Sequence, residues 1–161
     1  GDRLAALQRA IDVITQDPAV EAVAVSAVYE TDPVGGPEQP DYLNAVLTVR
    51  TSLVPIEVLA LAHLAEQDLH RTREVRWGAR TLDVDVINYG DVVSDDPVLT
   101  LPHPRAAERA FVLVPLLDAD PQATLAGTAT PAADLLAVLP PEDAAGVRKR
   151  EDLILTIDTG A

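Results

Sequence analysis

The stretch RTREVRWGARTLDVDVINY, residues 71–89, decides the fold of this chain. Its second half, 82–89, alternates apolar with polar residues and ends at a Gly-Asp turn, which predicts a β-strand. Its first half, 71–81, carries four arginines, a tryptophan and a glycine, and we predict a loop there. Because successive side chains of a strand point to opposite faces, Asp83 and Asp85 should share one face, roughly 7 Å apart. The apolar residues between them should face a core.

The segments on either side predict helices and strands in mixed order. Apolar residues at helical spacing predict a helix over 3–16, and a first-turn proline and acid predict another over 55–70. The remaining predictions are strands at 20–30 and 42–51 around a loop at 31–41, a hairpin within 92–101, a short helix at 104–110, a buried apolar run at 111–117 broken by a proline, a last helix at 131–138 and a last strand at 152–157. This order indicates one domain over 1–161, an α/β (α+β) sandwich with helices packed on an antiparallel or mixed sheet.

Charge and composition exclude several classes of protein. The formal net charge is −14, whereas general nucleic-acid binding needs a basic face. No stretch approaches the roughly 20 apolar residues of a membrane span. The chain has no cysteine, which excludes a disulfide framework and fits a cytoplasmic protein. We therefore expect a cytoplasmic protein that binds neither nucleic acid nor membrane.

The arginines of the predicted loop are a local exception in this acidic chain. They are Arg71, Arg73, Arg76 and Arg80. A guanidinium group donates two parallel hydrogen bonds to phosphate oxygens, so a basic segment on an acidic protein indicates a small anionic ligand. The alternative is that these arginines pair with surface carboxylates.

Asp83 and Asp85 suit a hard divalent cation such as Mg²⁺, with phosphate oxygens completing its shell. The alternative is a solvated strand face. Carboxylates that follow an arginine-rich segment favour a metal–nucleotide site. Because phosphoryl transfer depends mainly on positioning and charge neutralisation, such a site predicts a phosphoryl-transfer enzyme.

Other residues suit a flat heterocycle. Trp77 can stack on a planar ring, although a buried core position is its alternative. Phe111 offers a possible second wall. Asn44 has both a donor and an acceptor for a heterocycle edge, unless it is only a polar residue of an edge strand. His103 lies between two prolines that restrict its backbone.

Four segments together closely resemble the 6-hydroxymethyl-7,8-dihydropterin pyrophosphokinase family of folate biosynthesis. They are YETDPVG (29–35), QPDYLNAV (39–46), RWGARTLDVDVINYG (76–90) and LPHPRAAERAFVLVPL (101–116), and the resemblance extends over about residues 1–121. It implies transfer of the pyrophosphoryl group of ATP to the hydroxymethyl group of the pterin, with release of AMP. It also implies a ferredoxin-like fold and two Mg²⁺ ions. The Ala- and Arg-rich composition is typical of a high-GC bacterium.

The resemblance also implies roles for individual residues. Asp83 and Asp85 match the metal-binding pair, and Arg71 and Arg80 match the arginines that assist transfer. The pterin-side residues are Thr31, Val34, Tyr42, Asn44, Trp77, Asp83 and Phe111. The ATP-side residues are His63, Glu66, Arg73, Arg76, Arg80, Val86, Thr100, His103 and Arg109.

The resemblance leaves one gap and two alternatives. Gly1 and Asp2 match the end of a GSNLG turn, so the family's first strand and most of that turn are not in this sequence. The C-terminal segment 152–157 is one candidate to take that strand's place. We expect a monomer. The alternatives to the pyrophosphokinase are another Mg–ATP phosphotransferase, which would release ADP, and a ferredoxin-like module that binds nucleotide without turnover.

Overall fold

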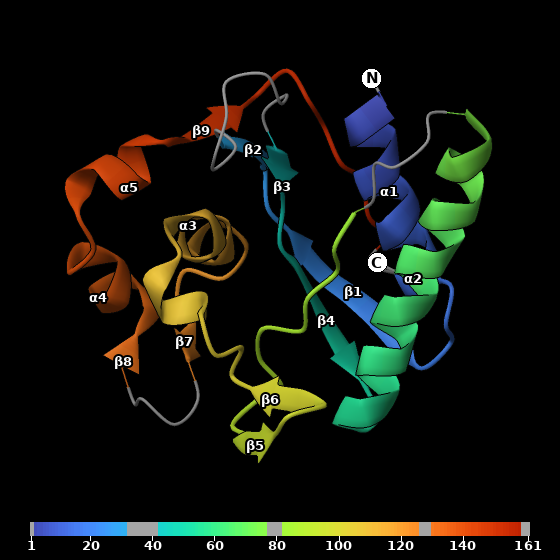
Figure 1. Ribbon diagram of the computed structural model, residues 1–161. Coiled ribbons are helices and arrows are strands. Elements are labelled where there is room, and N and C mark those ends of the chain that lie inside the picture. Colours follow the sequence, from blue (N-terminus) through green and yellow to red (C-terminus); the bar gives the residue numbers. More distant parts are fainter. Residues whose placement is uncertain (1, 32–41, 77–81, 126–129, 159–161) are drawn as a thin grey trace.

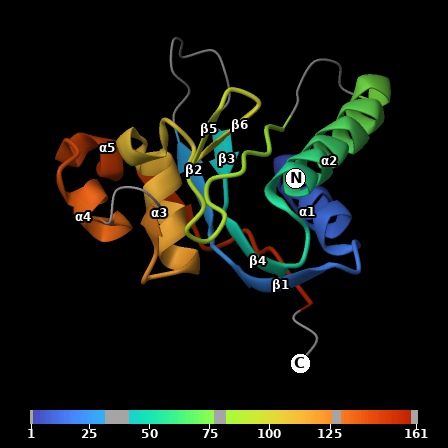
Figure 2. The same cartoon turned by 90° about the horizontal axis from the view of Figure 1, so that it is seen from below.

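The computed structural model describes residues 2–31, 42–76, 82–125 and 130–158 (Figure 1). Helices gather on two sides of a set of antiparallel strands (Figures 1 and 2). The helices are α1 (Asp2–Thr15), α2 (Pro55–Arg76), α3 (Ala110–Ala119), α4 (Ala132–Ala137) and α5 (Pro141–Ala145), with a 3₁₀ turn η1 (Ala106–Glu108). The strands are β1 (Val20–Val25), β2 (Val28–Thr31), β3 (Tyr42–Asn44), β4 (Leu47–Thr51), β5 (Ser94–Asp96), β6 (Leu99–Leu101), β7 (Thr124–Leu125), β8 (Thr130–Pro131) and β9 (Val147–Arg150).

Two antiparallel sheets lie at the centre of the molecule. One pairs β1 with β4, and the other has the order β3-β2-β9. Smaller hairpins join β5 to β6 and β7 to β8. The predicted mixture of helices with an antiparallel sheet is confirmed.

The helix pair α1–α2 lies to one side of these strands, and α3, α4 and α5 lie to the other. Ala6, Ala10 and Val13 of α1 are buried against Ala65 and Leu69 of α2. The guanidinium group of Arg9 donates to both carboxylate oxygens of Asp68, at 2.8 and 3.1 Å, which raises the pKa of Arg9. The predicted helix at 3–16 is confirmed, with one face buried as its apolar spacing requires.

The predicted strands 20–30 and 42–51 each break into two. Ser26 lies at the first break, where its amide donates to the Val46 carbonyl at 2.8 Å. Its hydroxyl accepts the Val46 amide at 2.9 Å. These two bonds satisfy the backbone where the ladder stops, so both strands change direction at the same level and move from one sheet to the other.

Helix α2 continues to Arg76, so the prediction of a loop beginning at residue 71 is wrong for 71–76. Arginine and glutamate are good helix formers, and no glycine or proline occurs between Pro55 and Gly78. A charge-rich sequence was mistaken for a loop. Residues 77–81 lie outside the described residues.

Residues 82–89 run extended past β4 but pair with no strand in the part of the chain that the structure describes, so the strand prediction there is not met. Their backbone is held by single contacts, including His103 N to Ile87 O at 2.8 Å. A strand needs a hydrogen-bonded neighbour as well as an alternating pattern, and 82–89 has none among the described residues.

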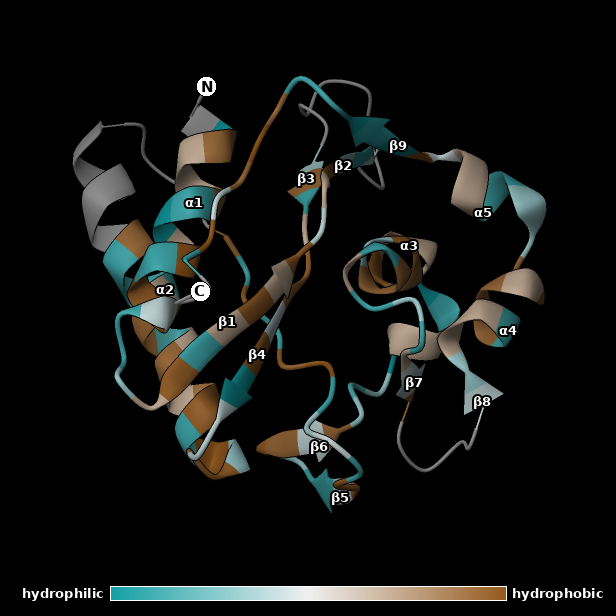
Figure 3. Cartoon of the chain, turned by 180° about the vertical axis from the view of Figure 1, so that it is seen from behind, coloured by the Kyte–Doolittle hydropathy of each residue, from teal (hydrophilic) through white to brown (hydrophobic). Residues whose placement is uncertain are grey.

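The apolar run at 111–117 is helical, since α3 passes through the buried Pro115 instead of breaking there. Packing explains this outcome: Leu113 and Leu116 of α3 are buried in one cluster with Leu125 and three alanines, and α3 is apolar over much of its length (Figure 3). The predicted short helix is only the 3₁₀ turn η1.

The C-terminal region also differs from the prediction. Helix α4 confirms the helix expected at 131–138 but is followed by α5. The last strand is β9, at 147–150, and not 152–157. Beyond β9, Leu153, Leu155 and Ile157 pack against the α1 side of the core, and the Gln8 amide binds the backbone N–H and C=O of Thr156, each at 2.9 Å.

Candidate active site

Five of the predicted site residues line one largely apolar cavity of about 380 Å³. The cavity lies between β3–β4 and the segment 82–88, and β1, α1, α2 and α3 also contribute to its wall. The five residues are Asn44, Asp83, Asp85, Val86 and Phe111. The fold thus gathers proposed metal, pterin and ATP residues from three separate segments, β3, 82–88 and α3, at one place.

Asp83 and Asp85 are both exposed on the extended segment, and neither makes a hydrogen bond or ion pair within the described residues. Their oxygens are the ligand type that Mg²⁺ prefers. The described ranges hold no group of three or more His, Cys, Asp or Glu suited to a metal. The carboxylate pair therefore fits a metal only if a ligand such as a phosphate supplies further oxygens.

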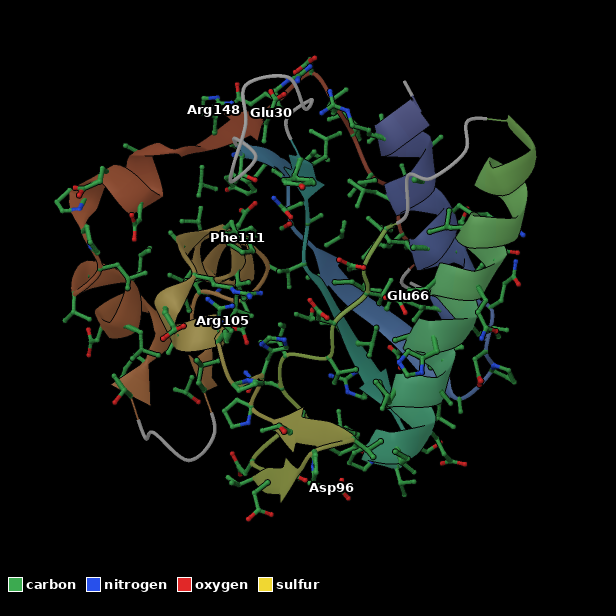
Figure 4. The ribbon with its side chains drawn as sticks, viewed as in Figure 1. Glu30, Glu66, Asp96, Arg105, Phe111 and Arg148 are labelled. Carbon is green, nitrogen blue, oxygen red and sulfur yellow. The ribbon has the colours of Figure 1, made fainter. Side chains whose placement is uncertain are left out.

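Glu66 fixes the backbone between these two carboxylates. Its Oε2 accepts a hydrogen bond from the Val84 amide at 2.7 Å, and Figure 4 shows Glu66 on α2 facing the extended segment. Glu66 was predicted as an ATP contact. In this structure its carboxylate holds the segment that carries Asp83 and Asp85.

The pterin-side strands place Thr31 next to Asn44. The Asn44 amide nitrogen donates to the Thr31 hydroxyl at 3.0 Å, across the paired strands β2 and β3. Thr31 is buried, whereas Tyr42 at the start of β3 is half exposed. The hydrogen bond orients the Asn44 amide at the cavity wall.

Phe111 is 38% exposed at the first turn of α3, and its ring lines the cavity. The Arg109 guanidinium lies over that ring, 5.4 Å from its centre, in a cation–π contact. Figure 4 shows Phe111 on α3, with Arg105 nearby on the preceding turn. A half-exposed ring at a cavity can stack on a planar ligand at little conformational cost.

Most of the predicted ATP-side residues that the structure describes lie outside this cavity. The Thr100 hydroxyl donates to the Asp96 carbonyl at 3.0 Å within the β5–β6 hairpin. His103 is half-buried, and its Nδ1 accepts the Arg105 amide at 3.3 Å. His63 is exposed on α2 and does not line the cavity.

Several predicted residues cannot be placed. Val34, Trp77 and Arg80 lie outside the described residues. Arg71, Arg73 and Arg76 lie on the described backbone of α2, but their side chains are outside the described part.

Sequence reasoning missed Asn88, which lines the same cavity. Its amide nitrogen donates to the Thr124 carbonyl at 3.0 Å, while its buried Oδ1 has no partner among the described residues. The available signal was a polar residue within an apolar extended segment.

These features define a class: a small α/β domain whose cavity combines paired carboxylates, an amide and an aromatic ring, suited to a planar ligand beside a phosphate–metal group. The family model described as 7,8-dihydro-6-hydroxymethylpterin-pyrophosphokinase matches residues 1–121, and the chain belongs to that family.

Curated relatives agree with the family match. A protein from Bacillus subtilis is 45% identical over 118 residues, covering 73% of this chain and 71% of the relative. One from Pseudomonas aeruginosa is 40% identical over 119 residues, covering 74% of each. One from Mycobacterium leprae is 44% identical over 161 residues, covering 92% of this chain and 82% of the relative. All three are named 2-amino-4-hydroxy-6-hydroxymethyldihydropteridine pyrophosphokinase. None of the described helices combines the length and apolarity needed to cross a membrane.

Proposed function

We propose that this chain transfers the pyrophosphoryl group of ATP to the hydroxymethyl group of 6-hydroxymethyl-7,8-dihydropterin, releasing AMP, in folate biosynthesis. The family match over residues 1–121 supports this activity. The structural observation that supports this activity is that Asn44, Asp83, Asp85 and Phe111 line the same cavity.

The chemistry requires no protein nucleophile. The pterin hydroxyl oxygen forms a bond to the β-phosphorus, and the bond from that phosphorus to the oxygen bridging the α-phosphorus breaks. AMP leaves with the electron pair, and the hydroxyl proton is released to solvent. The protein contributes position and charge. Asn44 reads the pterin edge, Phe111 stacks on its ring, and Arg71 and Arg80 neutralise charge on the phosphates.

Asp83 and Asp85 would hold Mg²⁺, two ions in the complete complex. When bound, Mg²⁺ neutralises phosphate charge and orients the phosphates. Glu66, through Val84, keeps the two carboxylates on a fixed stretch of backbone.

The test is to incubate the protein with ATP, MgCl₂ and 6-hydroxymethyl-7,8-dihydropterin and to measure AMP. AMP formed only in the presence of the pterin is the expected result. ADP in place of AMP would favour a simple phosphotransferase. Binding of both ligands by folded protein without AMP would favour a module that binds without turnover.

We also propose that a strand preceding residue 1 completes the sheet and gives it ferredoxin-like form. The support is that 82–88 runs past β4 without a strand partner, and that β4 pairs only with β1 among the described residues. The alternative, the C-terminal segment 152–157, also pairs with no strand among the described residues. Adding an alternating apolar strand before Gly1 should protect the amides of 82–88 from hydrogen exchange, and unchanged exchange would refute the proposal.

A further inference from the structure

The strand β9 lies outside the region matched by the family model, which ends at residue 121. It pairs antiparallel with β2, with Val147 opposite Thr31 and Arg150 opposite Val28. Strand β2 therefore lies between β9 and β3, which carries Asn44. The C-terminal part of the chain thus contacts one of the strands that form the candidate pterin wall.

Apolar burial does not explain why β9 stays in this position. Its sequence is VRKR, and Figure 3 shows it as one of the most hydrophilic strands. Its described side chains are half-buried or exposed. A strand of this composition needs a specific interaction besides its ladder hydrogen bonds.

Arg150 supplies that interaction. Its Nη1 donates to Glu30 Oε1 at 2.9 Å, linking β9 to β2 directly before Thr31. Its Nε and Nη2 bind both carboxylate oxygens of Asp152, at 2.9 and 2.8 Å. The Asp152 contact fixes the guanidinium plane, so that Nη1 is directed at Glu30. Glu30 is mostly buried, with its side chain 16% exposed, and Arg3 of α1 approaches its other oxygen at 3.9 Å. Figure 4 shows Glu30 on β2 beside β9.

We propose that Arg150 is a positioning residue for the pterin site. Through Glu30 it holds β2 in the register that places the Thr31 hydroxyl to accept the Asn44 amide. This inference rests on the proposed function, because it takes Asn44 as a residue that reads the pterin. Arg150 itself does not line the cavity.

The kinetic test compares Arg150→Ala with Lys149→Ala, which removes a neighbouring cation of the same strand that forms no ion pair with the described residues. Arg150→Ala should raise the KM for the pterin about fivefold. The kcat and the KM for ATP should stay unchanged, and Arg150→Lys should recover part of the loss, since lysine can still pair with Glu30. Lys149→Ala should have the same kcat and the same two KM values as the wild type. A lower kcat with both KM values unchanged would indicate only a smaller folded fraction and would overturn the proposal, as would an unchanged pterin KM.

A second measurement does not need turnover. In Arg150→Ala, hydrogen exchange at the amides of 28–31 and 42–44 should accelerate, while α2 and α3 keep their protection. Unaltered exchange at these strands, or acceleration throughout the protein, would overturn the positioning role. If the wild-type protein formed no AMP, the proposed function would fail, yet this exchange comparison would still decide whether Arg150 orders the strands.

Discussion

The carboxylate of Glu66 accepts the backbone amide of Val84 at 2.7 Å, between the two exposed aspartates Asp83 and Asp85. A helix side chain thus fixes an extended segment that has no strand partner among the described residues. The geometry of the carboxylate pair then depends on one hydrogen bond to a charged group, an interaction worth about 1.5–3 kcal/mol.

We therefore predict that Glu66→Ala weakens Mg-dependent ATP binding by about tenfold or more, because the segment at 83–85 loses its anchor. Glu66→Gln should weaken it less, since the amide oxygen can still accept the Val84 N–H. Gln67→Ala, at the exposed next position of α2, is the matched control. Titration calorimetry with MgATP measures all three, and equal affinity for Glu66→Ala and wild type would contradict the role assigned to Glu66.

Asp85→Ala should abolish Mg-dependent ATP binding, because one carboxylate cannot replace the pair as a metal site. Asp95→Ala removes an exposed carboxylate of the β5–β6 hairpin, outside the cavity, and should bind MgATP normally. Calorimetric titrations with ATP, in the presence and in the absence of MgCl₂, separate the Mg-dependent part of the ATP affinity from the part that does not need the metal. An unchanged Mg²⁺ requirement in Asp85→Ala would remove Asp85 from the metal site.

Phe111→Ala should raise the KM for the pterin by about 5- to 150-fold, since stacking of an aromatic side chain on a heterocyclic base contributes roughly 1–3 kcal/mol. Phe111→Tyr keeps the ring and should stay near the wild type. Steady-state kinetics with the pterin varied at saturating ATP measures the effect. A rise in the KM for ATP instead would place Phe111 on the nucleotide side.

Much of the site was predictable because it rests on local patterns. Asp83 and Asp85 are both exposed in the structure, as the alternation within 82–89 predicts, whereas the apolar residues next to them are half-buried. The joint position of Asn44 and Phe111 was reached only through the family resemblance, since no periodic pattern connects residues so far apart. In the structure, Asn44 and Phe111 both line the cavity.

The secondary-structure predictions that were wrong share one physical cause, which is that contacts between distant parts of the chain decide the structure there. The break of both long strands at Ser26 depends on bonds to Val46, which sequence cannot display. Proline inside an apolar run predicts a helix break at Pro115, yet α3 continues through it, because burial of Leu113 and Leu116 outweighs the missing N–H. The sequence VRKR of β9 has no alternation of apolar residues that could predict a strand, and its pairing with β2 and the Arg150–Glu30 hydrogen bond join residues far apart in the chain.

The cluster around α3 gives a prediction about stability. Leu113 is fully buried, so Leu113→Ala should lower the free energy of unfolding by about 2–5 kcal/mol through lost apolar burial and the cavity left behind. Val138→Ala, at a position 79% exposed, should change it by less than about 0.5 kcal/mol. Urea unfolding followed by circular dichroism measures both variants. Equal midpoints for the two would mean that α3 does not form the core described here.

The ion pair between Arg150 and Asp152 predicts a specific dependence of stability on pH. The Arg150 guanidinium lowers the pKa of the Asp152 carboxyl from an ordinary 3.8 to about 2. A carboxyl group whose pKa is depressed on folding stabilises the protein above its unfolded pKa, and this contribution is lost as the pH falls through the folded pKa. Asp152→Asn should therefore be less stable than wild type at pH 7, by a difference that stays constant down to about pH 4 and disappears between about pH 4 and pH 2.

Urea midpoints at several pH values test this expectation, within the range where the wild-type protein unfolds cooperatively. Glu151→Gln removes the adjacent exposed carboxylate, which pairs with none of the described residues, and its urea midpoint should match that of wild type at pH 7. A gap between Asp152→Asn and wild type that persisted unchanged at pH 2 would show that the loss comes from the altered side chain and not from its charge. The ion pair would then not be what holds the Arg150 guanidinium towards Glu30.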